Sequence, residues 1–181
     1  MSSAPDGAVK QLFSAAEIAE RVEQLARDIA AAKLDNLLVV AILKGSFVFA
    51  ADLVRALHAQ GLKPEIDFIY LASYDGETKS SGAVRLLHDV ESDLEGRDVV
   101  IVDDILDSGL TLDFAMKRLI ARGAKRVLTC VLVDKQVSRG TKIAPDFKGF
   151  SCPPVFVVGY GMDWRNRYRE LPFIGELRFD A

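Results

Sequence analysis

The 181-residue sequence has few of the residues that build disulfide frameworks or metal centres. It contains two cysteines, Cys130 and Cys152, and two histidines, His58 and His88, and none of them has the spacing of a metal site. Cys130 lies inside an apolar run, where a buried thiol is expected. We therefore expect a cytoplasmic protein with reduced cysteines and with histidines that serve structure or surface.

Long apolar runs and a one-sided charge balance are also missing. No apolar run approaches the roughly 18 residues that a membrane-spanning helix needs, and the N-terminal stretch MSSAPDGAVK has no signal-peptide core. The formal net charge is −3, which offers no broad attraction to nucleic acid or to an anionic membrane. We expect a soluble protein in which any basic site is local.

What the chain does contain is the composition of one globular domain. Half of its residues are hydrophobic and 27% are charged, which argues against general disorder. Residues 1–12 are mostly small or polar, and we expect them to form a mobile tail. Residues 13–181 are then long enough for one domain with a substantial core.

Apolar strands alternate with helical patterns along this domain. Strands are expected at residues 37–43, 65–74, 84–90, 99–102, 127–133 and 156–158, and helices beginning near residues 14, 47 and 110. The polar stretch DGETKSSG after the second strand predicts a mobile loop. This alternation predicts an α/β fold, a parallel sheet with helices on both faces. Ligands should then bind beyond the carboxyl ends of the strands.

The stretch VVIVDDILDSGLTL, residues 99–112, follows a buried strand with a turn suited to an anion. Ser108, Gly109 and Thr111 bring two hydroxyls and flexible backbone N–H groups to a helix N-terminus, where a phosphate is favourably held. The turn has neither the GxxxxGK[ST] spacing of nucleoside-triphosphate loops nor the GxGxxG of dinucleotide folds. The sequence therefore predicts a phosphate site of another kind.

Three carboxylates accompany this turn. Asp103 and Asp104 can accept hydrogen bonds from a vicinal diol or hold a hydrated divalent cation. Asp107 can face a group that loses a proton. A phosphorylated sugar would satisfy all three side chains.

Five separated segments, in the same order, resemble the type I phosphoribosyltransferases and, among them, the hypoxanthine–guanine phosphoribosyltransferases. They are LKGS at 43–46, SYDGETKSSG at 73–82, VVIVDDILDSGLTL at 99–112, Asp134-Lys135, and FVVGYGMDWRNRYRELPFIG at 156–175. The resemblance implies the type I fold, in which a small hood from the terminal segments covers the parallel sheet. It also implies a purine-salvage enzyme that uses Mg²⁺ and forms a homodimer or homotetramer. Its reaction would transfer the 5-phosphoribosyl group from phosphoribosyl diphosphate to hypoxanthine or guanine.

The same resemblance implies a role for each matching residue. The donor-binding residues would be Lys44, Gly45, Asp103, Asp104, Asp107, Ser108, Gly109, Leu110, Thr111 and Arg169. The purine-binding residues would be Ile105, Lys135, Phe156, Val157 and Asp163, and the Mg²⁺ ligands would be Asp103, Asp104 and Asp163. Asp107 would be catalytic and take the proton of the purine nitrogen, while a mobile loop with Ser73 and Tyr74 would close over the site. The Leu43-Lys44 peptide is a candidate for a cis bond.

This assignment gives base selectivity a physical reason. Lys135 would donate to the purine 6-oxo group, Phe156 would stack on the ring, and the Val157 backbone would bind the edge of the base. An adenine amino group presents donors instead of an acceptor, so it would leave the Lys135 ammonium unpaired. Adenine should therefore be rejected, whereas hypoxanthine, guanine and xanthine cannot be ranked from the sequence.

The sequence departs from the family pattern in two places, and the fold allows one alternative function. Asp103 stands where many relatives carry Glu, and Tyr70, Leu71 and Ala72 stand where some carry basic residues. The rival is an RNA-binding regulator of pyrimidine-operon attenuation, which shares the fold and a similar donor motif. Asp107, Lys135 and the segment 156–169 favour the transferase.

Overall fold

The computed structural model describes residues 8–73, 84–137, 141 and 143–179. The helices are α1 (Ala15–Ala31), α2 (Phe47–Ala59) and α3 (Leu110–Ala121). The strands are β1 (Ala8–Phe13), β2 (Leu38–Leu43), β3 (Glu65–Ser73), β4 (Val84–His88), β5 (Asp98–Leu106), β6 (Arg126–Lys135), β7 (Phe147–Cys152), β8 (Val157–Val158) and β9 (Ile174–Arg178). None of these helices is long and apolar enough to cross a membrane.

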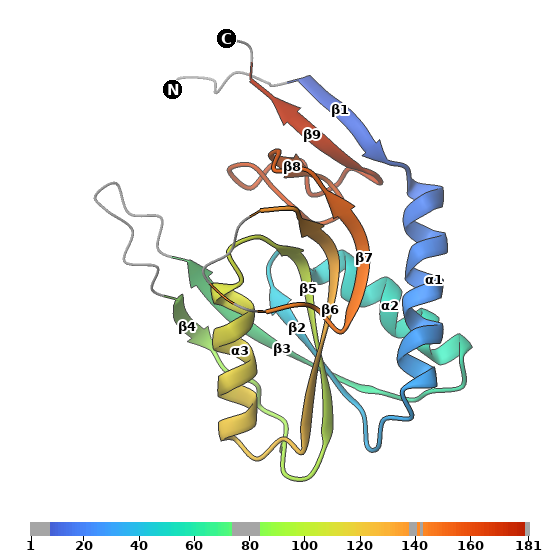
Figure 1. Ribbon diagram of the computed structural model, residues 1–181, viewed down its shortest axis with the longest axis vertical. Helices are drawn as coiled ribbons and strands as arrows, with labels where there is room; N and C mark the ends of the chain where they lie inside the picture. Colours follow the sequence, from blue (N-terminus) through green and yellow to red (C-terminus); the bar gives the residue numbers. More distant parts are fainter. Residues whose placement is uncertain (1–7, 74–83, 138–140, 142, 180–181) are drawn as a thin grey trace.

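Six strands form the main sheet, in the order β4-β3-β2-β5-β6-β7. The pairs β3-β2, β2-β5, β5-β6 and β6-β7 are parallel, and β4 is antiparallel to β3. Helices α1 and α2 cover one face and α3 covers the other (Figure 1). The expected α/β sheet with helices on both faces is therefore confirmed.

Strand β2 shows how the sheet is buried on both sides. Val39 and Ala41 pack in the core under α1 and α2, whereas Leu38, Val40 and Ile42 pack in the core under α3. Successive side chains of a strand point to opposite faces, so a continuous apolar run suits a strand that is covered twice. This explains why the run LLVVAIL predicts a central strand.

Helix α1 begins at the expected capping box. The Glu17 N–H donates to Ser14 Oγ at 3.3 Å, and the Ser14 N–H donates to the Glu17 carboxylate at 2.8 Å. These bonds satisfy two N–H groups that lack partners within a helix. The apolar residues at helical spacing are buried on one stripe: Ile18, Val22, Leu25 and Ile29.

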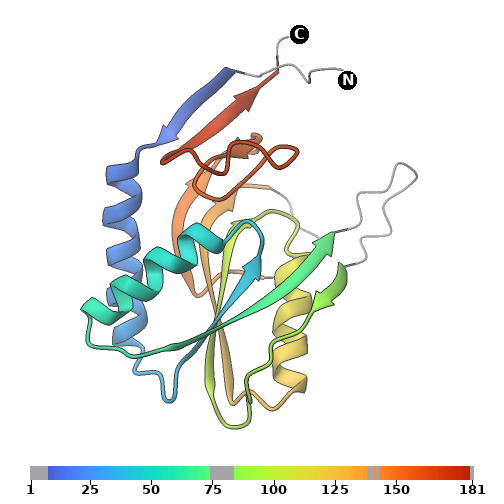
Figure 2. The same cartoon turned by 180° about the vertical axis from the view of Figure 1, so that it is seen from behind.

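A second, smaller sheet forms the hood. Its strand order is β1-β9-β8, with antiparallel pairs, and it lies over the carboxyl ends of β2, β5 and β6 (Figures 1 and 2). The predicted mobile tail of residues 1–12 is wrong for residues 8–12, because they belong to β1 and pair with β9. Residues 1–7 lie outside the described part of the chain.

Three strand boundaries differ from expectation in ways that matter for the site. Strand β5 continues to Leu106 and β6 to Lys135, so Asp103 and Asp104 lie within a strand and not after it. The pairing of Leu106 with Asp134 keeps the two strands together up to this point. Strand β8 is shorter than expected and begins after Phe156.

Candidate active site

The loop between β2 and α2 lies directly beside the acidic pair of β5. The Leu43-Lys44 peptide, a candidate for a cis bond by resemblance, is cis, and the Lys44 ammonium lies 5.7 Å from the centre of the Tyr70 ring. A side chain at Gly45 would place its Cβ 1.9 Å from Asp104 Oδ2. A glycine is therefore needed at this position for the Asp104 carboxylate to keep its place.

The acidic pair consists of a buried carboxylate, Asp103, and a half-buried one, Asp104, which repel each other. Burial raises the pKa of the Asp103 carboxyl well above its ordinary value, and the neighbouring Asp104 charge raises it further. Burial also raises the pKa of Asp104, against which the positive charge of Arg169 acts. Two adjacent carboxylates in this environment need hydroxyl donors or a cation to be stable in their ionised form.

The turn before α3 has the geometry of an anion site. Gly109 adopts a left-handed φ of +82° at the N-cap of α3, and a Cβ there would lie 2.2 Å from Thr141 Oγ1. The Thr141 hydroxyl donates to the Ser108 carbonyl at 3.0 Å. The helix N-terminus at Leu110 and Thr111 supplies N–H groups that suit a phosphate. Thr141 has no signal in the sequence and was not anticipated.

Asp107 and Lys135 form an ion pair across two neighbouring strands. Lys135 Nζ lies 2.7 Å from Asp107 Oδ2. The Lys135 side chain is 14% exposed and the Asp107 side chain 54%. A largely buried ammonium thus holds a carboxylate that is open to solvent, with Asp107 following β5 and Lys135 ending β6.

The C-terminal segment reaches the same site through Arg169. Arg169 forms an ion pair with Asp163 at 2.6 Å and donates to the Gly161 carbonyl at 2.5 Å, and the Asn166 N–H donates to Asp163 at 2.6 Å. A Cβ on Gly161 would lie 2.3 Å from the Gly45 carbonyl oxygen. This close approach of two glycines brings the Arg169 segment to the β2–α2 loop.

Phe156 and Val157 lie at the edge of the hood. Leu177 N–H donates to the Phe156 carbonyl at 2.8 Å, and Val157 stands opposite Glu176 of β9. Bonded and non-bonded pairs alternate in an antiparallel ladder, so the Val157 N–H and C=O point away from β9. Because β8 is the edge strand of its sheet, these groups face the side on which a ligand can bind.

Some of the predicted site residues are not brought together in the described part of the chain. No group of three His, Cys, Asp or Glu side chains suited to a metal ion forms among the described residues. Asp103, Asp104 and Asp163 are therefore not gathered around one position in the described part of the chain, where Asp163 forms an ion pair with Arg169. Ile105 packs against the core of the α1–α2 face. Tyr74 lies outside the described residues, as does the side chain of Ser73.

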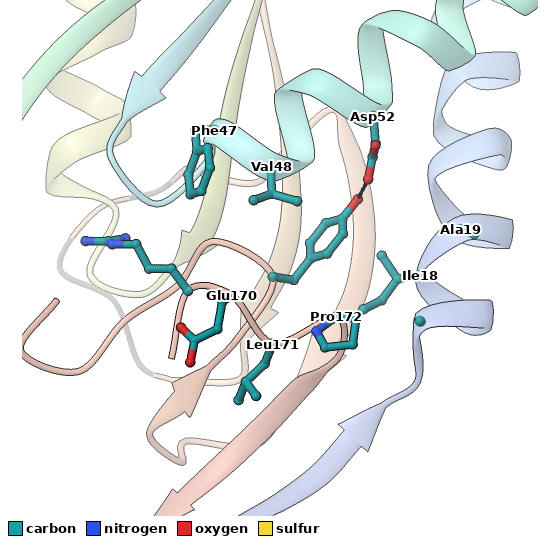
Figure 3. Close-up of a pocket in the computed structure, with 11 residues that line it drawn as sticks. Ile18, Ala19, Phe47, Val48, Asp52, Glu170, Leu171 and Pro172 are labelled. Carbon is teal, nitrogen blue, oxygen red and sulfur yellow. Dashed lines mark hydrogen bonds between the residues drawn. The ribbon is translucent and has the colours of Figure 1, made fainter. Parts of the chain in front are cut away.

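Tyr160 is a supporting residue that sequence reasoning missed. It has a left-handed φ of +49°, between two glycines with φ of +96° and +99°, and its hydroxyl donates to Asp52 of α2. The bond ties the turn that carries Gly161 to the helix that follows Gly45. A cavity of about 560 Å³ lies beside it, lined by residues of α1, α2 and the C-terminal segment, including Arg169 (Figure 3).

We expect Tyr160→Phe to lower the free energy of unfolding by about 1.5–3 kcal/mol, the usual worth of a hydrogen bond to a charged acceptor. Urea unfolding measures the change. Asp52→Ala removes the same bond from its other side, so the double variant should lose less than the sum of the single losses. Fully additive losses would show that the bond contributes nothing.

The sequence and the fold are both similar to those of known proteins. A model of the phosphoribosyl transferase domain family matches residues 8–165. The chain is 43% identical over 169 residues to a hypoxanthine-guanine phosphoribosyltransferase of Dictyostelium discoideum, covering 92% of this chain and 94% of that protein. It is 40% identical over 170 residues to one of Bacillus subtilis, covering 93% of each. A solved structure of Trypanosoma cruzi hypoxanthine phosphoribosyltransferase, in complex with the product IMP, matches with a TM-score of 0.87, 35% identity and 98% coverage of both chains. The chain therefore belongs to the phosphoribosyl transferase family and, within it, to the hypoxanthine-guanine phosphoribosyltransferases.

Proposed function

We propose that the protein transfers the 5-phosphoribosyl group of phosphoribosyl diphosphate to hypoxanthine or guanine, forming IMP or GMP and diphosphate. The observation that carries this proposal is one arrangement of charge. An acidic pair, in which Asp103 is buried and Asp104 half-buried, and a helix N-terminus lie near the end of β5, and the Lys135–Asp107 ion pair lies beside them. The first two suit a phosphorylated sugar, and the ion pair suits a base with an oxo group and an acidic N–H.

The donor would bind along the turn before α3. Backbone N–H groups and hydroxyls from Asp107 to Thr111 would hold the 5′-phosphate, and Asp103 with Asp104 would accept hydrogen bonds from the ribose hydroxyls. The diphosphate would meet Lys44, the Gly45 backbone and Arg169. These cations stabilise the negative charge that grows on the leaving group as the bond from C1 of the ribose to the diphosphate oxygen breaks.

The acidic pair also fits magnesium. Its oxygens are hard ligands, its two charges repel each other, and Gly45 leaves room for the Asp104 carboxylate. Mg²⁺ commonly takes one or two protein carboxylates and completes its shell with water and substrate oxygens, so three protein ligands are not required. When bound, the ion would neutralise charge on the donor. We propose Asp103 and Asp104 as its ligands, and Asp163 as a ligand on the diphosphate side.

The base would lie between the hood and β6. Phe156 would stack on the purine, the outward-facing backbone of Val157 would bind its edge, and Lys135 would donate to the 6-oxo oxygen. Ile105 would pack near the ring. A purine nitrogen forms the new bond to C1 of the ribose, and its proton passes to Asp107, which the Lys135 ammonium holds at 2.7 Å.

The proposed function is tested with the four common purine bases. Purified protein, phosphoribosyl diphosphate and Mg²⁺ should yield nucleotide with hypoxanthine and guanine, and none with adenine. An RNA filter-binding assay across salt concentrations examines the regulator in parallel, because phosphate contacts weaken steeply as salt rises. Salt-dependent RNA binding without any nucleotide formation would favour the regulator over the enzyme.

Lys135→Ala should raise the KM for hypoxanthine by about 10- to 100-fold, because a hydrogen bond from a charged donor is worth roughly 1.5–3 kcal/mol. The dissociation constant for phosphoribosyl diphosphate, measured by calorimetry, should change by less than about threefold. Lys148→Ala is the matched control. Lys148 lies on the neighbouring strand β7 and forms an ion pair with Asp134 of β6 at 3.6 Å. Equal losses for base and donor would show that Lys135 is not a base-binding residue.

We also propose a homodimer or homotetramer. Ile66 and Phe68 are exposed on one face of β3, and Phe47 is exposed at the start of α2. Large exposed apolar side chains on a strand face are typical of subunit contacts. Light scattering of the purified protein distinguishes the two assemblies.

We also propose a cytoplasmic location. The two cysteines are free and buried, which supports this proposal.

A further inference from the structure

Three aromatic rings from distant parts of the chain meet at one end of the hood. Phe156 precedes β8, Trp164 lies in the loop after it, and Phe179 follows β9 directly. The ring centres of Trp164 lie 5.2 Å from Phe156 and 5.1 Å from Phe179, and those of Phe156 and Phe179 lie 6.4 Å apart. All three pairs meet edge to face, with interplanar angles of 62° to 82°.

This cluster is assembled without being buried. Phe156 is 40% exposed and Phe179 is 47% exposed. Edge-to-face contacts fix the relative orientation of rings, because the positive edge of one meets the negative face of the next. The Arg165 guanidinium lies 5.1 Å from the Trp164 ring and adds a cation–π contact. Phe156 is therefore held in one orientation while much of its surface stays open.

The strands of the hood fix the position of Phe179. It follows Arg178, the last residue of β9, and β9 pairs with β1 on one side and with β8 on the other. The strand that carries Phe179 is thus anchored to the strand that follows Phe156. A ring at this position contacts both Phe156 and Trp164, and nothing in the reaction itself requires it.

We propose that Phe179 is a positioning residue for the purine, one that holds Phe156 and Trp164 ready for a flat base. The proposal rests on the proposed function, in which Phe156 stacks on the purine. Without Phe179, the rings of Phe156 and Trp164 gain rotational freedom that base binding must then remove. The variant should lose affinity for the base, because neither Phe156 nor Trp164 has been assigned to the phosphoribosyl donor.

The test compares Phe179→Ala with two other variants. Phe179→Tyr keeps the ring and should restore wild-type behaviour. Ile120→Ala is the matched control, because Ile120 is 55% exposed on α3 and lies outside the aromatic cluster. Phe179→Ala should raise the KM for hypoxanthine about 3- to 10-fold, the worth of one or two aromatic contacts, with kcat and the KM for phosphoribosyl diphosphate unchanged.

Fluorescence provides a readout that does not depend on activity. Trp164 is the single tryptophan of the sequence, so tryptophan emission, excited at a wavelength that tyrosine does not absorb, reports on this cluster. Phe179→Ala should move the emission to longer wavelength as the indole meets water, whereas Phe179→Tyr and Ile120→Ala should not.

The outcomes separate this inference from the proposed function. Wild-type protein that forms no nucleotide overturns both. Active enzyme in which Phe179→Ala leaves the hypoxanthine KM unchanged overturns the positioning role alone, even if the emission shifts. Equal rises in both KM values, or failure of Phe179→Tyr to restore the hypoxanthine KM, would show a general structural role instead.

Discussion

Asp107→Asn is expected to lower kcat by about 10²–10⁴-fold, the usual worth of a positioned general base. The amide keeps the size of the side chain and can still accept a hydrogen bond from Lys135, but it cannot take the purine proton. Affinity for phosphoribosyl diphosphate, measured by calorimetry with Mg²⁺, should remain within about threefold, because in the proposed site backbone N–H groups would hold most of the phosphate.

Asp113→Asn is the matched control for this variant. Asp113 pairs with Lys117 at 2.6 Å and lies in the first turn of α3. Asp113→Asn therefore also removes one carboxylate from an aspartate–lysine pair, but outside the turn from Asp107 to Thr111. It should leave kcat unchanged. Thermal unfolding checks that both variants are folded. Turnover near that of the wild type in folded Asp107→Asn would rule out the proton role and leave Asp107 as a residue that shapes the turn.

The second large effect is expected at Gly45. Gly45→Ala places a methyl group 1.9 Å from the present position of Asp104 Oδ2, so the carboxylate must move away. In the proposed site, the Asp104 carboxylate would then lose its contacts with the ribose hydroxyls and Mg²⁺. Hydrogen bonds to charged groups are worth roughly 1.5–3 kcal/mol each, so affinity for phosphoribosyl diphosphate should fall on the order of 10²-fold in calorimetry.

Gly61→Ala serves as the control for this substitution. No atom of the described residues lies within 4 Å of a Cβ at Gly61, although its φ of +83° makes alanine strained there. The control should lose some stability and keep its donor affinity. If Gly45→Ala binds the donor as tightly as the wild type, the Asp104 carboxylate is not part of the donor site.

The central sheet could be predicted because its strands are buried on both faces. Runs such as LLVVAIL and VVIV contain only apolar residues, and such runs are typical of parallel strands under helices. The capping box at Ser14 marked the start of α1 for an equally local reason. The edge elements lack such signals. Strands β1 and β9 mix polar with apolar residues, because hood strands are only partly covered.

The β7 strand shows another limit of pattern reasoning. Its sequence FKGFSC includes a glycine, which usually weakens a strand. A Cβ on Gly149 would lie 2.3 Å from the Leu132 carbonyl oxygen, so the glycine is there to let β7 approach β6. That reason is tertiary and cannot be found in the local sequence.

In the candidate site, too, the local features could be predicted and the long-range contacts could not. The turn before α3 and the acidic pair lie close together in the chain, so their chemistry was visible in one short stretch. The contacts that join distant segments were not, such as Thr141 with Ser108, Gly161 with Gly45 and Tyr160 with Asp52. The ion pair of Asp163 with Arg169 is a further contact that the sequence pattern did not indicate.

The most direct test of the account is the yield of products from purified protein with phosphoribosyl diphosphate, hypoxanthine and Mg²⁺. IMP and diphosphate should form in equal amounts, the reaction should stop when EDTA removes the metal, and added Mg²⁺ should restore it. Absence of IMP at saturating substrate concentrations would contradict the account, and so would diphosphate released without IMP.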